Sequence, residues 1–225
     1  MGRLLEVLRQ SGKFENTLIM YISDNGIAFP AAKTTLYDPG IHLPCIVRLP
    51  NRLQTGTVCD AMISWCDLAP TILDFAGEDP AADAFQGRSF KTILEGKKES
   101  GWDEVYASHT FHTVTMYYPM RAVRGRRYKL ILNLIHELPF LLARDLQDSL
   151  AWREGERAGR THFGRRRVES FLHRPQFELY DLSNDPLELN NLAGDPGHRH
   201  LLKEYQEKIR AFQKRTNDPW LEAVS

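Results

Sequence analysis

Two side chains that carry oxygen ligands stand directly after a compact apolar run near the start of the chain. Residues 17–23 (TLIMYIS) are followed at once by Asp24 and Asn25. A carboxylate beside an amide carbonyl suits Ca²⁺, which takes roughly 6–8 oxygens, so this pair can supply only part of a coordination shell. Side chains at the carboxyl end of a strand in an α/β sheet point into the crevice where such sheets bind ligands. The pattern therefore predicts a partial metal site at Asp24 and Asn25.

The same dipeptide also has a purely structural interpretation. Asn25-Gly26 is of the type that most strongly indicates a β-hairpin turn. A tight hairpin needs an alternating strand after the turn, whereas residues 27–33 contain Pro30 and three alanines. On the sequence alone both interpretations stay open.

The cysteines and two of the histidines offer no further site. Cys45, Cys59 and Cys66 form neither a disulfide framework nor a Cys-x-x-Cys metal pattern. Their odd number leaves at least one thiol unpaired or paired outside the chain, so the redox compartment stays open. We interpret His42 and His136 as structural residues.

The elements that must position Asp24 and Asn25 belong to an α/β layer. A leucine-rich face that ends at Gly12 predicts a surface helix over residues 2–11. The run 17–23 is typical of a strand that is buried on both faces of a parallel sheet. The other elements of this layer are predicted as a strand over 44–49 and helices over 67–75 and 88–95.

The remainder of the chain has an antiparallel pattern. Short β-type runs between turn signals predict strands over 104–107, 120–123, 128–132 and 177–182. Asp195 and Pro196 mark the start of a long helix, because apolar residues then recur at helical spacing. The stretch 144–174 reads as charged helix and loop. We therefore expect an α/β fold, with a partial sheet and helices over 1–100 and a smaller subdomain over 101–225 whose antiparallel sheet packs on the terminal helix.

Composition indicates a globular chain without a strong overall charge. Of 225 residues, 42% are hydrophobic, and 29 basic residues balance 29 acidic ones, so the net charge does not point to nucleic acid or a membrane surface. Basic residues outnumber acidic ones between Arg121 and Arg174, a stretch that either holds a polyanion such as a sulfated sugar or forms solvated helix faces. There is no apolar run long enough to span a membrane.

The stretch SDNGIAFPAAKTTLYDPGIHLP, residues 23–44, resembles the second signature region of type I sulfatases. Later stretches look like successive landmarks of the heparan N-sulfatase group of that family. They are DLAPTILD (67–74), VTMYYPMR (114–121), FELYDL (177–182) with Asp185-Pro186 and Asn191-Leu192, and the final DPW (218–220). The resemblance implies an alkaline phosphatase-like fold and hydrolysis of sulfate from a sulfated sugar, with the N-sulfate of glucosamine as the first expectation.

Carried over residue by residue, the resemblance makes Asp24 and Asn25 calcium ligands and Lys33 the catalytic cation that contacts the sulfate. A metal and a cation together would neutralise charge on the sulfuryl oxygens as the S–N or S–O bond breaks.

The resemblance also implies contacts from the second part of the chain. His109 and His112 precede the VTMYYPMR stretch, where sulfatases place a loop over the substrate. We expect both to contact substrate and His109 to transfer a proton, for which the ordinary pKa of an imidazole is suited; the alternative is that they are exposed or only support the site. Arg121 is expected to bind a substrate carboxylate or sulfate, or else to form a structural salt bridge.

Sulfatases of this kind use a formylglycine, made from the first residue of a Cys/Ser-x-Pro/Ala-x-Arg motif. We expect no such motif in this chain, because none of the three cysteines begins the pattern, and the acidic pair that the family places after its first strand is absent. We therefore expect the formylglycine to lie in an N-terminal half that this chain does not contain, and the chain alone to be inactive. The resemblance further implies a sulfated saccharide as partner, a homodimer as an option for the full-length protein, and a secreted, periplasmic or lysosomal location.

Two rival functions remain open. A phosphonate or phosphodiester hydrolase of the same superfamily would use the same metal and cation, because both serve phosphoryl and sulfuryl oxygens. A noncatalytic module would instead hold sulfated glycans on the basic stretch, with strong salt dependence.

Overall fold

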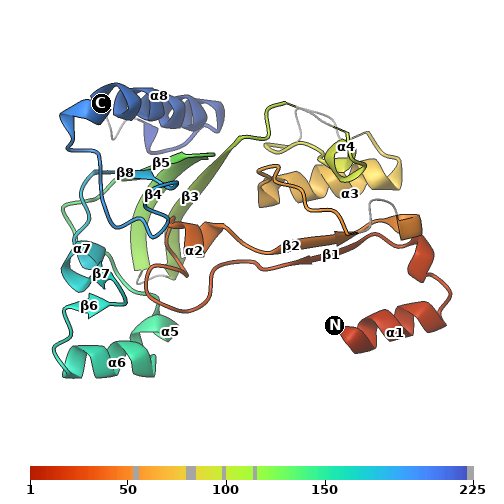
Figure 1. Ribbon diagram of the computed structural model, residues 1–225, viewed down its shortest axis with the longest axis horizontal. Coiled ribbons are helices and arrows are strands. Elements are labelled where there is room, and N and C mark those ends of the chain that lie inside the picture. Colours follow the sequence, from red (N-terminus) through yellow and green to blue (C-terminus); the bar gives the residue numbers. More distant parts are fainter. Residues whose placement is uncertain (53–55, 80–84, 98–99, 114–115, 222–225) are drawn as a thin grey trace. The chain divides into compact units, whose positions relative to one another are not determined.

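The structure is a computed structural model that describes residues 1–52, 56–79, 85–97, 100–113 and 116–221 (Figure 1). The chain forms two compact units. Unit 1 comprises Met1–Ser23 and Pro44–Asp103, and unit 2 comprises Asp24–Leu43 and Glu104–Ser225. The second boundary lies close to the division expected at residue 100. The segment Asp24–Leu43 differs, because it is folded into unit 2.

Unit 1 consists of short helices and one small sheet. Its elements are α1 (Gly2–Gln10), η1 (Phe14–Asn16), β1 (Ile19–Ile22), β2 (Cys45–Arg48), η2 (Pro50–Arg52), η3 (Trp65–Asp67), α3 (Leu68–Ala76) and α4 (Lys91–Leu94). The predicted helix over 2–11 is confirmed, and Gly12 follows it with φ +71°. No residue of α1 is buried.

The apolar run 17–23 forms a strand, but its environment differs from the expected one. β1 pairs with β2 in an antiparallel two-stranded sheet, with Ile19 opposite Arg48 and Ile22 opposite Cys45. The Tyr21 side chain is exposed. An uninterrupted apolar run specifies a strand but carries no information about the direction of its partner, which is why a parallel sheet was expected.

Asp67 does not cap α3 through its side chain. Its carboxylate instead accepts the backbone N–H of Ser64 (2.7 Å) and of Arg88 (2.8 Å), so it joins the preceding turn to the chain before α4. The predicted helix over 67–75 is present as α3, and the one over 88–95 is shortened to α4.

Unit 2 is built on a four-stranded antiparallel sheet. Its strand order is β3 (Glu104–Thr113), β4 (Met116–Gly125), β5 (Tyr128–Asn133) and β8 (Phe177–Asp181). Residues 114 and 115, the first two of the VTMYYPMR stretch, lie outside the described residues. All four predicted strands are confirmed, and β3 and β4 are longer than expected because they continue into a hairpin with register shifts between His109 and Thr113.

Alternating side chains of this sheet form two cores, one on each face. Val123, Leu130, Leu132 and Leu179 pack against Tyr205 and Ile209 of the terminal helix α8 (Arg199–Arg215). The alternate positions Met120, Ala122, Ile131 and Tyr180 face a second core with Tyr37, Trp152 and Phe171. The expected sheet backed by a terminal helix is therefore present (Figure 1).

The second core is covered by the remaining short elements of unit 2. They are α2 (Asp38–Ile41), α5 (Arg144–Gln147), α6 (Leu150–Arg157), β6 (His162–Phe163), β7 (Arg166–Arg167) and α7 (Val168–Leu172). The remaining short element, η5 (Pro196–His198), directly precedes α8. Among the described residues, no helix is long and apolar enough to cross a membrane.

Candidate functional site

The segment Asp24–Leu43 closes on itself around two glycines. A Cβ atom at Gly26 would lie 2.3 Å from the carbonyl oxygen of Pro39, and one at Gly40 would lie 2.4 Å from that of Thr35. Such close approach of backbone to backbone excludes any side chain at these positions. The strand before this segment pairs with β2 rather than with residues after Gly26, so Asn25-Gly26 is not the turn of a tight hairpin.

Asp24 and Asn25 lie exposed at the start of this loop. The Asp24 carboxylate accepts the N–H of Asn25 (3.0 Å), and the Asn25 Nδ2 donates to Gly26 O (2.7 Å). The two side chains offer oxygen donors of the kind that Ca²⁺ prefers, which fits the expected metal. The described residues contain no group of three or more His, Cys, Asp or Glu that could hold an ion, so this pair would be a partial ligand set.

Lys33 lies in a strained part of the same loop. Its neighbours Ala31 and Thr34 both have φ +64°, a left-handed conformation that is costly for residues other than glycine. The Lys33 N–H donates to Ile27 O (3.1 Å), which fixes the backbone from which the side chain extends.

The Lys33 ammonium contacts a carboxylate that the sequence did not single out. Its Nζ donates to Oδ2 of Asp145 on α5 at 2.5 Å, and the two side chains are 19% and 46% exposed. The hydrogen bond from Lys33 lowers the pKa of Asp145, and the nearby charges of Lys33 and His112 act in the same direction. Asp145 thus lies near two of the predicted site residues. The partners Lys33 and Asp145 are 112 positions apart, and no local pattern signals such a pairing.

A buried charge cluster holds the end of the loop on the sheet. Lys129 of β5 is fully buried and contacts the Asp38 carboxylate and Glu188 Oε1, the latter at 2.7 Å. Glu188 also accepts the Asp38 N–H (2.7 Å), and Arg124 Nη2 donates to Asp38 Oδ2 (2.9 Å). Burial pushes the pKa of Asp38 upward, but the hydrogen bonds and charges of Arg124 and Lys129 outweigh it and lower the pKa to about 2.

His109 is partly buried on β3, and its Nδ1 lies 3.2 Å from Tyr118 O. Because a carbonyl oxygen only accepts, Nδ1 carries the proton and Nε2 is left as an acceptor. Nε2 is buried and has no hydrogen-bond partner among the described residues. Burial lowers the pKa of His109, and the charges of His112, Arg174 and Arg121 act in the same direction, which favours the neutral ring. His112 lies exposed on the same strand.

Arg121 forms a structural salt bridge, which is the second of the two roles that the sequence allows for it. Its guanidinium binds both carboxylate oxygens of Asp218, and the two side chains are 5% and 4% exposed. Its Nη1 also donates to the carbonyl oxygens of His109 (3.1 Å) and Met120 (2.8 Å). A substrate anion would have to displace Asp218, and substrate binding by Arg121 stays a prediction.

The expectation that this chain contains no formylglycine motif is wrong for one serine. Ser149-Leu150-Ala151-Trp152-Arg153 matches Ser-x-Ala-x-Arg. In the structure Ser149 is the N-cap of α6, and its hydroxyl accepts the Trp152 N–H at 3.2 Å. Trp152 is buried in the second core, and Arg153 pairs with Asp148 on the surface. Ser149, Trp152 and Arg153 therefore each make a structural contact in this part of unit 2.

Comparisons with known proteins converge on one group of enzymes. The family described as "N-sulphoglucosamine sulphohydrolase, C-terminal" matches residues 31–147. The human N-sulphoglucosamine sulphohydrolase is 36% identical over 98% of this chain and 46% of its own length. An ulvan-active sulfatase of Formosa agariphila is 32% identical over 100% of this chain and 36% of its own length. The chain thus spans less than half of these relatives.

Solved structures have the same fold. One solved protein, in complex with its substrate D-glucosamine-2-N,6-O-disulfate, has a TM-score of 0.70 and 26% identity to this chain. The match covers 97% of this chain and 38% of that protein chain. A phosphonate monoester hydrolase from Silicibacter pomeroyi has a TM-score of 0.66 at 22% identity, with 95% and 38% covered. At that identity the second likeness concerns the fold alone.

Proposed function

The chain belongs to the N-sulphoglucosamine sulphohydrolase C-terminal family, and from this premise we propose that it is part of a sulfatase that hydrolyses sulfate from a sulfated saccharide. The N-sulfate of glucosamine is the first candidate substrate, because the family and the human relative both carry that activity in their names. The phosphonate hydrolase alternative has support from the fold only.

One observation supports this assignment most strongly. The loop 24–43 carries two oxygen donors and a cation on a backbone that two glycines and the Asp38 cluster hold in place. We propose that Asp24 and Asn25 hold part of a calcium shell and that Lys33 binds the sulfate. When bound, a calcium ion would stabilise negative charge on the sulfuryl oxygens.

The second half of the proposed site comes from β3 and α5. His112 would contact the sugar, and the Nε2 of His109 would accept a hydrogen bond rather than donate a proton in the neutral state. Hydrolysis of a sulfamate adds water across the S–N bond and releases sulfate and an amine. The attacking formylglycine hydrate would come from a residue outside this chain.

The experiment is to sequence the source DNA upstream of Met1, express the complete reading frame and measure sulfate release from N-sulfoglucosamine. We expect an in-frame Cys/Ser-x-Pro/Ala-x-Arg motif and activity that a calcium chelator abolishes and that Asp24→Ala and Lys33→Gln each reduce. The 225-residue chain is expected to be inactive. Equal hydrolysis of a phosphonate monoester, or activity unchanged in both variants, would contradict the proposal.

A further inference from the structure

The basic stretch of unit 2 contains one short segment in which arginines are not balanced by acids. Residues 157–167 (RAGRTHFGRRR) include five arginines, one histidine and no Asp or Glu. They run from the end of α6 through the β6–β7 hairpin, which turns at Gly164 with φ +57°. The structure therefore concentrates the excess charge on one tight hairpin.

The hairpin has an inner and an outer face. Phe163 pairs with Arg166 across the strands, and His162 pairs with Arg167. Phe163 stacks on the buried Trp152 at 4.6 Å between ring centroids, and Arg166 lies over the ring of Tyr37 at 3.9 Å. Because side chains alternate between the two faces of a strand, His162 and Arg167 point outward.

Three arginines of this segment have no protein partner. Arg160, Arg165 and Arg167 are exposed, and within the described part of the chain their guanidinium groups form no ion pair or hydrogen bond. Most other basic side chains between residues 121 and 174 contact a carboxylate: Arg121, Arg124, Arg127, Lys129, Arg144, Arg153 and Arg157. The unpaired charge of the basic stretch thus lies on and beside the hairpin, which together we call the arginine hairpin (residues 160–167).

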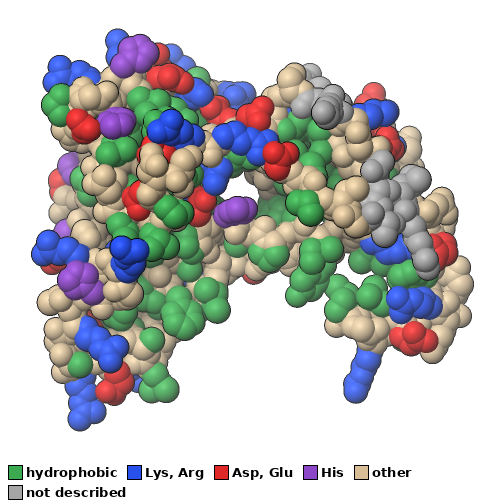
Figure 2. All heavy atoms as spheres, viewed as in Figure 1, with side chains coloured by type: hydrophobic (Ala, Val, Ile, Leu, Met, Phe, Trp, Pro, Cys, Tyr) green, Lys and Arg blue, Asp and Glu red, His purple; other side chains and the backbone are tan. Residues whose placement is uncertain are grey.

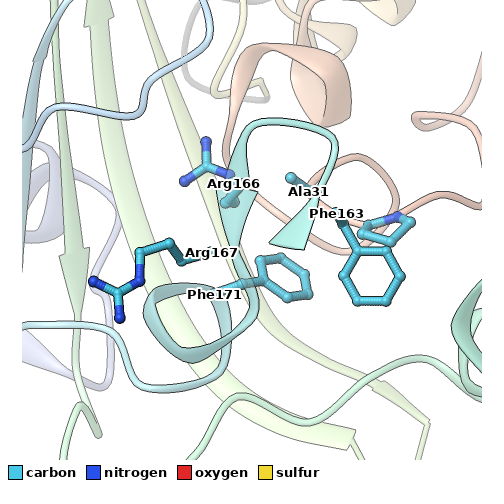
Figure 3. Close-up of a pocket in the computed structure, with 6 residues that line it drawn as sticks. Ala31, Phe163, Arg166, Arg167 and Phe171 are labelled. Atoms are coloured by element: carbon cyan, nitrogen blue, oxygen red, sulfur yellow. The ribbon is translucent and has the colours of Figure 1, made fainter. Parts of the chain in front are cut away.

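The arginine hairpin lies beside the loop that carries Lys33. Pro30 and Ala31 line a small cavity together with Phe163, Arg166, Arg167 and Phe171. The cavity has a volume of about 20 Å³, room for one water molecule and not for a sugar. Figure 3 shows the Arg167 guanidinium directed away from the two phenylalanine rings, and Figure 2 shows basic side chains gathered on the surface over β6, β7 and α6. The cavity therefore marks a contact between the loop and the hairpin, while the guanidinium of Arg167 faces solvent.

We propose that Arg160, Arg165 and Arg167 form a second anion subsite, which binds a further sulfate or carboxylate of a sulfated saccharide chain whose terminal sulfate contacts Lys33. This inference rests on the proposed function for its choice of ligand. Guanidinium groups suit it, because their planar fork binds sulfate and carboxylate oxygens in pairs and is weakly hydrated. A saccharide longer than one unit would then bind more tightly than the monosaccharide.

The test measures binding of D-glucosamine-2-N,6-O-disulfate and of a heparin-derived hexasaccharide to the full 225-residue chain at several salt concentrations. The variant is Arg165→Gln/Arg167→Gln. The control is Arg144→Gln/Arg153→Gln, which removes the same charge from two exposed arginines of the same unit that pair with Asp148. Both variants alter exposed side chains, and circular dichroism checks that they fold.

We expect the hairpin variant to lose at least tenfold in hexasaccharide affinity. The slope of log affinity against log salt concentration should become shallower by about two, because each guanidinium–anion contact that forms releases about one counterion and the variant lacks two such contacts. Monosaccharide affinity should not change, and the control should resemble the parent chain. If the control variant loses the same hexasaccharide affinity, the loss reflects net charge alone and the proposal is wrong. If the hairpin variant loses no affinity, the proposed subsite does not exist. A DNA oligonucleotide that binds with the same affinity and hairpin dependence would overturn the saccharide assignment. Loss of monosaccharide binding in Lys33→Gln tests the proposed function separately.

Discussion

At the residue scale, the Lys33–Asp145 pair places a negative charge next to the cation that we propose for the sulfate. A sulfate group that approaches Lys33 competes with the Asp145 carboxylate for the same ammonium. The partly exposed position of Asp145 means that water already weakens the pair, so the exchange costs little. Asp145 would then be available to a sugar hydroxyl or to the amine that hydrolysis releases.

Because sulfate and Asp145 compete for Lys33, substitutions of Lys33 and of Asp145 should change the ligand affinity in opposite directions. Lys33→Gln should weaken binding of D-glucosamine-2-N,6-O-disulfate roughly 10- to 100-fold, because a hydrogen bond to a charged group contributes about 1.5–3 kcal/mol. Asp145→Asn should keep or increase the affinity. Calorimetric titration of the chain measures both, and a comparable loss in the two variants would show that Asp145 holds Lys33 in place instead of competing for it.

Ser149 begins a sequence pattern that matches the formylglycine motif, but its observed role is that of a helix N-cap. Its hydroxyl caps α6, and we expect it to remain an ordinary serine. Mass spectrometry of the peptide that contains Ser149 checks this directly, since conversion to formylglycine removes two hydrogens. Ser149→Ala should lower the free energy of unfolding by about 1 kcal/mol, the usual effect of losing an N-cap. Detection of formylglycine at this position would overturn the expectation that the nucleophile lies outside the chain.

Residue identities in the loop were predictable, and their partners were not. Asp24, Asn25 and Lys33 follow one another within ten positions, so a local motif contains them. Asp145 and Asp218 find their partners 112 and 97 positions away, and an isolated aspartate in a charged stretch looks like many others. The geometry at Lys33 and Arg121 could therefore come only from the folded structure.

At the scale of elements, the Arg121–Asp218 pair joins the turn after α8 to the β3–β4 hairpin. Breaking a buried ion pair from one side leaves an unpaired charge, so Asp218→Asn should destabilise the protein by about 3–5 kcal/mol. The double variant Arg121→Met/Asp218→Leu should be less destabilised than the single one. Chemical denaturation measures both. Monosaccharide affinity that falls together with stability, beyond the unfolded fraction, would instead favour a role of Arg121 in substrate binding.

The attachment of α2 to the sheet should depend on pH in acid. The pKa of Asp38 is about 2 in the folded state and about 3.9 in an unfolded chain, so the unfolded chain binds the proton more tightly. The stabilisation is present above pH 4 and is lost as the pH falls from 4 to 2, amounting to about 2 kcal/mol. Denaturation of the parent chain and of Asp38→Asn across this range should show a smaller pH slope in the variant. Glu156→Gln, which alters an exposed carboxylate that has no ion pair among the described residues, should leave the slope nearly unchanged.

Elements whose apolar side chains recur at regular spacing were predicted well. Elements whose position depends on contacts with residues far away in the sequence were not. The apolar side chains of α8 recur at helical spacing, and Tyr205 and Ile209 are buried as expected. The β6–β7 hairpin has two residues per strand, too few for an alternating pattern to be read. Its inner residues are set by Trp152 and Tyr37, which the sequence does not associate with it.

At the scale of the whole molecule, unit 1 presents apolar side chains that its own elements do not cover. Leu4, Val7, Tyr21 and Ile46 are each more than half exposed, and a two-stranded sheet is only marginally stable alone. We expect the chain to associate as its concentration rises, and Val7→Glu/Ile46→Lys to reduce this association. Sedimentation velocity compares the parent chain with this double variant. The control is Leu150→Lys, which alters an exposed residue of α6 in unit 2. A parent chain that stays monomeric at high concentration would contradict the prediction.

The placement of residues 24–43 in unit 2 has a consequence for biosynthesis. The loop leaves the ribosome early, but Lys33 must wait for a partner 112 positions later and Asp38 for one 150 positions later. At roughly 5–20 residues per second, translation keeps this segment without its final contacts for on the order of ten seconds. During that interval only contacts within the loop itself hold its glycines and strained backbone. The proposed site would therefore be among the last parts of the chain to assemble. Until then the nascent loop would be accessible to proteases and chaperones.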